Sequence, residues 1–129
     1  MVRIYKTKWL ARFTRREQIK DGDLSAAIRR AERGLIDADL GGGIVKLRLA
    51  RAGQGRSGGY RMLLAYQSGQ RAVFLYGFAK SERENISDDE FQTLREIGAT
   101  WLAADARQIA RAIEENALQE VTYDQDNAN

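Results

Sequence analysis

The 129-residue sequence predicts an α+β domain in which helices pack on a small antiparallel β-sheet, in the order β-α-α-β-β-β-α. Three observations lead to this prediction. Apolar residues recur at helical spacing near the N-terminus, they alternate with polar residues in the centre, and a capping box precedes a further helical stripe. With 43% hydrophobic residues a chain of this length supports one ordinary core, so residues 1–129 are expected to form a single domain.

The N-terminal third predicts a short strand and two helices. Residues 2–5 are predicted as the strand. Helical spacing follows in the apolar residues Trp9, Leu10 and Phe13. Asp23 is expected to cap a second helix, which Gly34 ends. The buried stripe of that helix would comprise Leu24, Ala27, Ile28 and Ala31.

The centre of the chain predicts three strands, at residues 44–50, 60–67 and 71–79. Successive side chains of a strand face opposite ways, so Lys46 and Arg48 must project together from the face opposite to their apolar neighbours. Residues 68–70 are predicted as a short hairpin loop. Residues 53–59 are too rich in glycine for a strand and are predicted as a mobile loop.

The C-terminal part predicts helix. Ser87 and Glu90 have the spacing of a capping box, so a helix is expected to begin there. Its apolar face would comprise Phe91, Leu94, Ile97, Trp101 and Leu102. After a break near residues 104–105 the helix is expected to continue, so that residues 87–120 form a C-terminal helical segment. Residues 124–129 are predicted to be frayed.

The charge is strongly asymmetric. No acidic residue lies between Leu40 and Ser81, whereas seven basic residues do. Residues 1–83 carry 18 Lys and Arg against 7 Asp and Glu, a net charge of +11, and residues 84–129 carry 3 against 11, a net charge of −8. A cationic body indicates a polyanionic partner, most simply nucleic acid. From charge alone, two solvated faces that pair with each other explain the pattern equally well.

Composition excludes several kinds of chemistry. The sequence has no cysteine, which excludes disulfides and thiolate metal sites, and no histidine, which excludes every Ser–His arrangement. No cofactor or metal site is predicted. The N-terminal residues lack the apolar core of a signal peptide, and no apolar run approaches membrane-spanning length, so a cytoplasmic protein is expected.

Five basic residues are candidates for a shared site on the sheet face that the helices leave free. They are Lys46, Arg48, Arg61, Lys80 and Arg83. Such a cluster would bind phosphates and could stabilise the extra charge of a pentacoordinate phosphoryl transition state. RNA cleavage by attack of the 2′-hydroxyl needs a base, an acid and charge stabilisation, but neither a metal nor a histidine.

Ordinary structural explanations compete with this interpretation. Alternating Lys and Arg on a strand more often mark a solvated sheet face than a catalytic one. The glycine-rich segment lacks the G-K-[ST] ending of a P-loop, so nucleotide binding is not predicted. The helical aromatic residues are expected to be core rather than platforms for stacked bases; they are Trp9, Phe13, Phe91 and Trp101.

Three segments together narrow these possibilities: the K-x-R strand of residues 41–48, the S-G-G-Y-R sequence of residues 57–61 and the K-S-E-R-x-N-I sequence of residues 80–86. In this combination the chain resembles the RelE/HigB-like toxins of bacterial type II toxin–antitoxin modules. The resemblance covers residues 40–90 well and residues 1–40 through the order of elements. It implies a RelE-like fold related to microbial ribonucleases, with a C-terminal helical extension.

The resemblance also implies a function. Such toxins are mRNA interferases that cut messenger RNA in the ribosomal A site, and a cognate antitoxin, here expected to be a helix-turn-helix protein, neutralises them. Carried over to this sequence, Lys46 becomes the candidate base and Arg61 the ligand of the transition-state phosphate. The remaining basic residues would contact substrate phosphates or ribosomal RNA; they are Arg48, Lys80 and Arg83.

The sequence departs from the best-known members at two positions, which keeps alternatives open. Ser81 stands where those members have an arginine. Those members also have a tyrosine shortly afterwards, near residues 86–87, that stacks on a base, whereas in this sequence no aromatic residue follows until Phe91. One alternative is therefore a degenerate member that only binds RNA or ribosomes, and another is a ParE-like toxin that poisons DNA gyrase. The acidic tail beyond about residue 97 is longer than in compact members and is expected to be a docking surface or a lid over the basic cleft.

Overall fold

The computed structural model describes residues 2–51 and 55–122, with side chains described outside residues 51–58. Within these residues six strands and four helices follow one another. They are β1 (Arg3–Thr7), α1 (Lys8–Glu17), α2 (Asp21–Glu32), β2 (Ala38–Gly41), β3 (Ile44–Arg51), β4 (Gly55–Gln67), β5 (Arg71–Ala79), α3 (Asp88–Ala103), α4 (Ala106–Glu114) and β6 (Leu118–Val121). None of these helices is long and apolar enough to cross a membrane.

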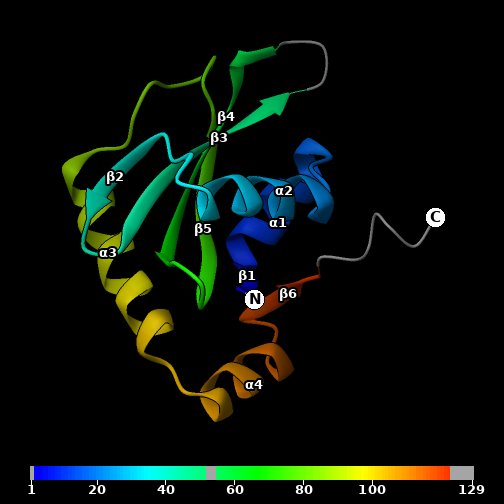
Figure 1. Ribbon diagram of the computed structural model, residues 1–129, viewed down its shortest axis with the longest axis vertical. Coiled ribbons are helices and arrows are strands. Elements are labelled where there is room, and N and C mark those ends of the chain that lie inside the picture. The colour runs from blue at the N-terminus through cyan, green and yellow to red at the C-terminus, as the bar shows by residue number, and fades with distance from the viewer. Residues whose placement is uncertain (1, 52–54, 123–129) are drawn as a thin grey trace.

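The strands form one mixed sheet in the order β2-β3-β4-β5-β1-β6 (Figure 1). The predicted α+β class is confirmed, but two details of the predicted order are wrong. The sheet has two strands more than predicted, β2 and β6, and β1 runs parallel to β5 rather than antiparallel. Both differences arise from pairing between segments far apart in the chain, which local alternation does not report.

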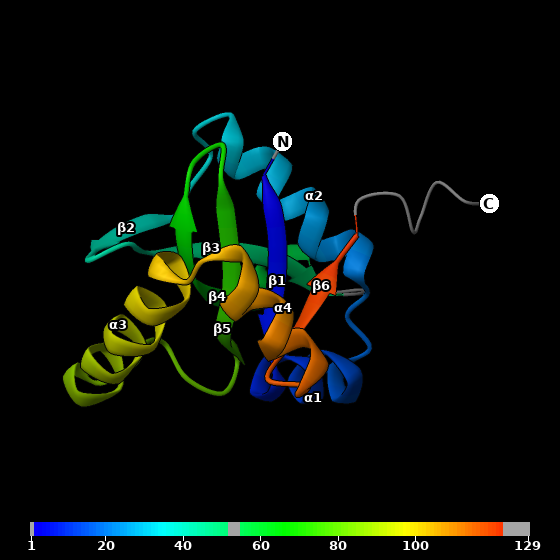
Figure 2. The same ribbon diagram turned by 90° about the horizontal axis from the view of Figure 1, so that it is seen from below.

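Helices cover both faces of the sheet, so the prediction that one face remains free is wrong. Figure 2 shows α2 and α3 on opposite sides of the strands. One core cluster joins α1 and α2 to the sheet and contains Leu10, Leu24, Ile28, Leu47 and Phe74. The second cluster joins α3 and α4 to the other face and contains Ile44, Leu63, Leu75, Leu94 and Ile109. The candidate basic residues therefore share their face with α3.

The N-terminal helices begin close to their predicted positions. The hydroxyl of Thr7 caps α1 by accepting a hydrogen bond from the backbone N–H of Leu10 at 3.3 Å. Asp23 does not occupy the N-cap of α2 as predicted, because the helix begins two residues earlier, at Asp21. The Asp23 carboxylate instead accepts a hydrogen bond from the N–H of Lys20 at 3.0 Å, from within the first turn.

The glycine-rich segment is largely strand, which corrects the predicted loop. Residues 52–54 lie outside the described residues, but β4 already begins at Gly55 and continues through Gly59. A Cβ atom at Gly59 would lie 2.1 Å from the backbone oxygen of Leu49 on β3. Glycine is therefore required here for close approach of two backbones rather than for a mobile turn. The predicted hairpin loop at residues 68–70 is present, with Gly69 at φ +73°.

The described part of the C-terminal segment, up to residue 122, joins the edge of the sheet and does not lie over the basic residues. The capping box at Ser87 and Glu90 begins α3 as predicted, and α4 follows after a break at Ala104. The expected helix over residues 115–120 is wrong, because β6 pairs antiparallel with β1 at the sheet edge and Leu118 is fully buried. The predicted frayed residues 124–129 lie outside the described part of the chain.

Candidate RNA-binding and cleavage site

The central strands bring most of the predicted basic residues to one face of the sheet. Arg48 on β3 lies directly opposite Arg61 on β4, and Arg61 lies opposite Phe78 on β5. Lys46 lies two residues before Arg48 and therefore projects from the same face. Opposed residues of neighbouring antiparallel strands have Cβ atoms about 5 Å apart, so these side chains are neighbours.

Arg83 reaches the same face from the segment that follows β5. Its guanidinium carbon lies 5.5 Å from the centre of the Phe78 ring, and Phe78 is the cross-strand neighbour of Arg61. We refer to Lys46, Arg48, Arg61 and Arg83 as the basic row. Lys80 lies apart from it, exposed just beyond the end of β5, where its backbone N–H donates to the oxygen of Gly59.

A carboxylate that sequence analysis did not single out lies between two members of the basic row. Arg48 Nε donates to Asp37 Oδ1 at 2.8 Å, and Arg61 Nε lies 4.0 Å from Asp37 Oδ2. Arg61 is buried, with 5% of its surface exposed, whereas the Arg48 side chain is 54% exposed. Asp37 therefore orients the guanidinium groups, and a phosphate that approached them would have to compete with its carboxylate.

Competition between the Asp37 carboxylate and a phosphate for the same arginines leads to a prediction for Asp37→Asn. The free energy of unfolding is expected to fall by about 1–3 kcal/mol, because the buried Arg61 loses its only charged partner within the described residues. Affinity for a short single-stranded RNA at low salt is expected to rise, because one competing negative charge is removed. Urea unfolding and fluorescence anisotropy measure the two effects. A simultaneous loss of stability and of RNA affinity would show that Asp37 only supports the fold.

Arg83 is held by a second carboxylate. Its Nη2 and Nη1 atoms donate to Glu90 Oε1 and Oε2 at 2.7 and 3.1 Å, and Nη1 also lies 3.3 Å from the hydroxyl of Tyr76. The pKa of Glu90 is lowered from 4.5 to about 2. The hydrogen bonds from Arg83 are the main cause, and the hydrogen bond from the backbone N–H of Ser87 is the second. The sequence predicts only that Glu90 caps α3. In the structure Glu90 both caps the helix and holds Arg83.

The lowered pKa of Glu90 predicts how Glu90→Gln changes with pH. A carboxylate whose pKa is lower in the folded protein stabilises the fold above its unfolded pKa, and this contribution disappears as the pH falls from about 4.5 to about 2. The difference in unfolding free energy between wild type and Glu90→Gln is therefore expected at neutral pH and is expected to shrink through that acid range. Urea unfolding at a series of pH values measures it. A difference that is constant with pH would contradict the assignment.

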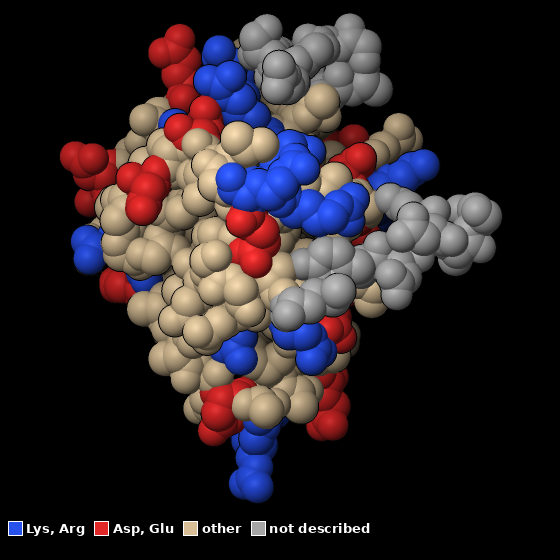
Figure 3. All heavy atoms as spheres, in the orientation of Figure 1, with Lys and Arg blue, Asp and Glu red and all other residues tan. Residues whose placement is uncertain are grey.

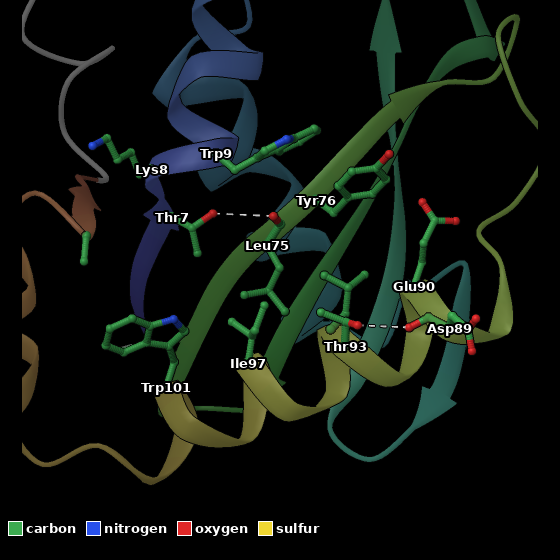
Figure 4. A pocket seen from close by; sticks show the side chains of 12 residues that line it. Thr7, Lys8, Trp9, Leu75, Tyr76, Asp89, Glu90, Thr93, Ile97 and Trp101 are labelled. Atoms are coloured by element: carbon green, nitrogen blue, oxygen red, sulfur yellow. Dashed lines mark hydrogen bonds between the residues drawn. The ribbon is translucent and has the colours of Figure 1, made fainter.

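An aromatic groove adjoins the basic row (Figure 4). The groove has a volume of about 670 Å³ and lies between α3, the junction of β1 with α1, and the middle of β5. Trp9 and Tyr76 line one side, with ring centres 4.4 Å apart, and Ile97 and Trp101 line the other from α3. Glu90 and Tyr76, both in contact with Arg83, are shared between the groove and the basic row.

This groove corrects one expectation for the helical aromatic residues. Phe13 is buried as predicted, and Phe91 and Trp101 pack against the second core cluster, but Trp9 is 41% exposed. Helical spacing places Trp9 on the apolar side of α1 correctly. It does not reveal that β1 pairs with β5 only as far as Phe74, which leaves the neighbouring surface open.

Comparison with known protein families decides the identity of the chain. The model of the RelE family, described as the RelE toxin of the RelE / RelB toxin–antitoxin system, matches residues 2–121. The chain belongs to the RelE toxin family. A search of curated proteins found no match.

Membership of the RelE family has coarse functional consequences. The chain is the toxin of a toxin–antitoxin system, and such toxins generally inhibit translation. RelE toxins are generally endoribonucleases and pair with an antitoxin. The family match extends through β6. It therefore includes the C-terminal segment, which the sequence motifs of residues 41–86 did not cover.

Proposed function

We propose that this RelE-family toxin is a ribosome-dependent mRNA endoribonuclease that uses the basic row as its active site. The observation that supports the proposal most strongly is the convergence of four cations on one sheet face: Lys46, Arg48, Arg61 and Arg83. Arg61 is buried. On an ordinary solvated sheet face all four side chains would be expected to be exposed, so the burial of Arg61 favours a site.

Attack of a 2′-hydroxyl on the adjacent phosphate forms a 2′,3′-cyclic phosphate and breaks the bond from phosphorus to the 5′-oxygen, which leaves as a hydroxyl after taking up a proton. Each group of the basic row can be given a role in this step. Lys46 is half-buried and has no acidic partner among the described residues, so we assign it as the base. Arg61 is held by its strand and by burial, so its guanidinium needs little reorganisation to stabilise the pentacoordinate phosphate. Arg48 is exposed and is assigned to the phosphate of the substrate.

The two remaining candidates lie at the end of β5 and suit contacts with a larger RNA surface. Lys80 is exposed, and Arg83 would exchange its Glu90 contact for a phosphate of the message or of ribosomal RNA. The chemistry so assigned requires no metal ion. We further propose that the protein acts in the cytoplasm, where ribosomes are, and that a helix-turn-helix antitoxin neutralises it.

The chemistry of the cut ends tests this proposal. Purified toxin, ribosomes and a defined message should yield 5′ fragments that end in a 2′,3′-cyclic or 3′ phosphate, and added EDTA at a concentration that preserves ribosomes should not change the result. A message with a single 2′-deoxyribose at the mapped cut should remain intact there. Cutting at the deoxy position would exclude the 2′-hydroxyl as nucleophile.

One observation favours a second candidate, a toxin that binds ribosomes without cutting. Three of the four cations are paired with carboxylates, Arg48 and Arg61 with Asp37 and Arg83 with Glu90, and Ser81 stands where the best-known members have arginine. Stalled translation with intact message would support this candidate. Normal translation with inhibited DNA supercoiling would instead support a gyrase poison.

A further inference from the structure

The aromatic groove presents an exposed indole ring beside the basic row. Trp9 stands on the apolar side of α1, yet 41% of its surface is exposed. Its ring stacks on that of Phe13 and lies 4.4 Å from that of Tyr76. Across the groove Ile97 is also exposed. An aromatic wall that is held by other rings and still open to solvent is a platform on which a further flat group can stack.

The polar groups of the groove do not suit a phosphate or a sugar. Two threonine hydroxyls line it, and both already donate to backbone oxygens. Thr7 donates to the oxygen of Leu75 at 3.4 Å, and Thr93 donates to the oxygen of Asp89 at 3.1 Å. Asp89 and Glu90 lie at one end of the groove, where their carboxylates repel a phosphate (Figure 4). The groove therefore favours a flat group without charge.

The cations that attract an RNA backbone lie outside the groove. The basic row adjoins it, and further basic side chains gather over α2, on the face of the molecule shown in Figure 3. Lys8 is the one cation among the described residues that line the groove, and its side chain points away from it (Figure 4). The charges therefore draw phosphates to the basic row and leave the groove to an uncharged part of the RNA.

Arg83 links the basic row to the groove. Its Nη1 atom lies 3.3 Å from the hydroxyl of Tyr76 in the groove wall, and its guanidinium carbon lies 5.5 Å from the centre of the Phe78 ring. The rings of Tyr76 and Phe78 are 6.3 Å apart, and Phe78 is the cross-strand neighbour of Arg61. A phosphate that displaced Glu90 from Arg83 would therefore bind beside the aromatic wall, and so would the base of the same nucleotide.

We propose that the aromatic groove is a base-binding pocket, in which an unpaired base of the RNA stacks against Trp9 and Tyr76 while its phosphate contacts Arg83. The pocket is formed by α1, β5 and α3, and so differs from the position near residues 86–87 at which the best-known members stack a base. Because its threonine hydroxyls are engaged, it recognises the face of a base rather than its edge, and it prefers the larger purines without separating adenine from guanine. RNA as the occupant rests on the proposed function, but stacking does not require that the RNA is cut.

Tryptophan fluorescence tests the pocket, because the sequence has two tryptophans and Trp101→Phe leaves Trp9 as the single emitter. The probes are RNA hexamers of adenosine, of uridine and of abasic ribose, all 2′-O-methylated so that they cannot be cut, and anisotropy of an attached dye measures their binding. The adenosine hexamer should quench Trp9 strongly and the uridine hexamer less. The abasic hexamer should bind without quenching, through the basic row alone. Quenching by the abasic hexamer, or binding of the adenosine hexamer without quenching, would overturn the proposal.

Two replacements of Trp9 separate stacking from ordinary apolar contact. Trp9→Leu should weaken the adenosine hexamer at least about tenfold and leave the abasic hexamer unchanged, whereas Trp9→Tyr, which keeps a ring, should weaken it much less. Leu35→Ala, which removes an exposed apolar side chain outside the groove, is the control and should change neither affinity.

The remaining outcomes distinguish the two proposals. Quenching of Trp9 by a toxin that leaves message intact would retain the pocket and overturn the ribonuclease proposal. Message cut at the wild-type rate by Trp9→Leu, with its hexamer affinity unchanged, would overturn the pocket alone. Quenching that grows with toxin concentration in the absence of RNA would identify a second copy of the chain as the occupant and would also contradict the pocket.

Discussion

Arg61→Ala is expected to lower the rate of message cutting by about 10²–10³-fold, the usual effect of removing a donor that stabilises transition-state charge. Arg61 is buried beside Asp37, so its guanidinium is held in place, whereas the neighbouring Arg48 side chain is largely exposed. The measurement is the single-turnover rate on ribosome-bound message, together with growth of cells that express the variant. Ribosome binding is expected to remain, because the exposed cations Arg48 and Lys80 are unchanged.

Two controls separate catalysis from folding and charge. Arg29→Ala removes an exposed positive charge from α2, on the opposite side of the sheet, and should leave the rate unchanged. Arg61→Lys retains the charge but loses the planar guanidinium, so most of the rate should still be lost. A full rate in Arg61→Ala, or an equal loss in Arg29→Ala, would remove Arg61 from the active site.

Gly59→Ala is expected to destabilise the protein by about 3 kcal/mol. A Cβ atom there would lie 2.1 Å from Leu49 O and 3.0 Å from Leu49 C, and these backbone atoms cannot move without separating β3 from β4. The same movement would separate Arg48 from Arg61, so the cutting rate should fall as well. Urea unfolding measures the loss of stability.

Gly34→Ala is the matched control for Gly59. Gly34 has φ +87°, but a Cβ atom there would meet nothing within 4 Å. The cost should therefore be that of the left-handed backbone alone, about 1 kcal/mol. If both variants lost the same stability, close approach of the two strand backbones would not be the reason for glycine at position 59.

Local patterns were sufficient to predict much of this architecture. The alternation around Lys46 and Arg48 places both on one face, and the capping box places the start of α3 at the correct residue. Such signals succeed because they depend on neighbours within one turn or one strand. The glycines before Tyr60 misled the prediction, because composition does not distinguish a mobile loop from close strand approach.

Contacts between distant segments were beyond local prediction. Asp37 and Arg48 are 11 residues apart, and the neighbours of Asp37 in the sequence give no sign that it will lie between two arginines. The pairing of β6 with β1 joins the two ends of the chain, and that pairing makes Leu118 a buried strand residue rather than the end of a helix. Of these contacts, the one made by Asp37 decides that Arg48 and Arg61 are held by a carboxylate.

Primer extension on a defined message in a reconstituted translation system tests the central claim most directly. With the wild-type toxin we expect discrete cuts within codons at the ribosomal A site, present with ribosomes and absent without them. Intact message at toxin concentrations that stop translation would contradict the claim that the basic row cuts RNA.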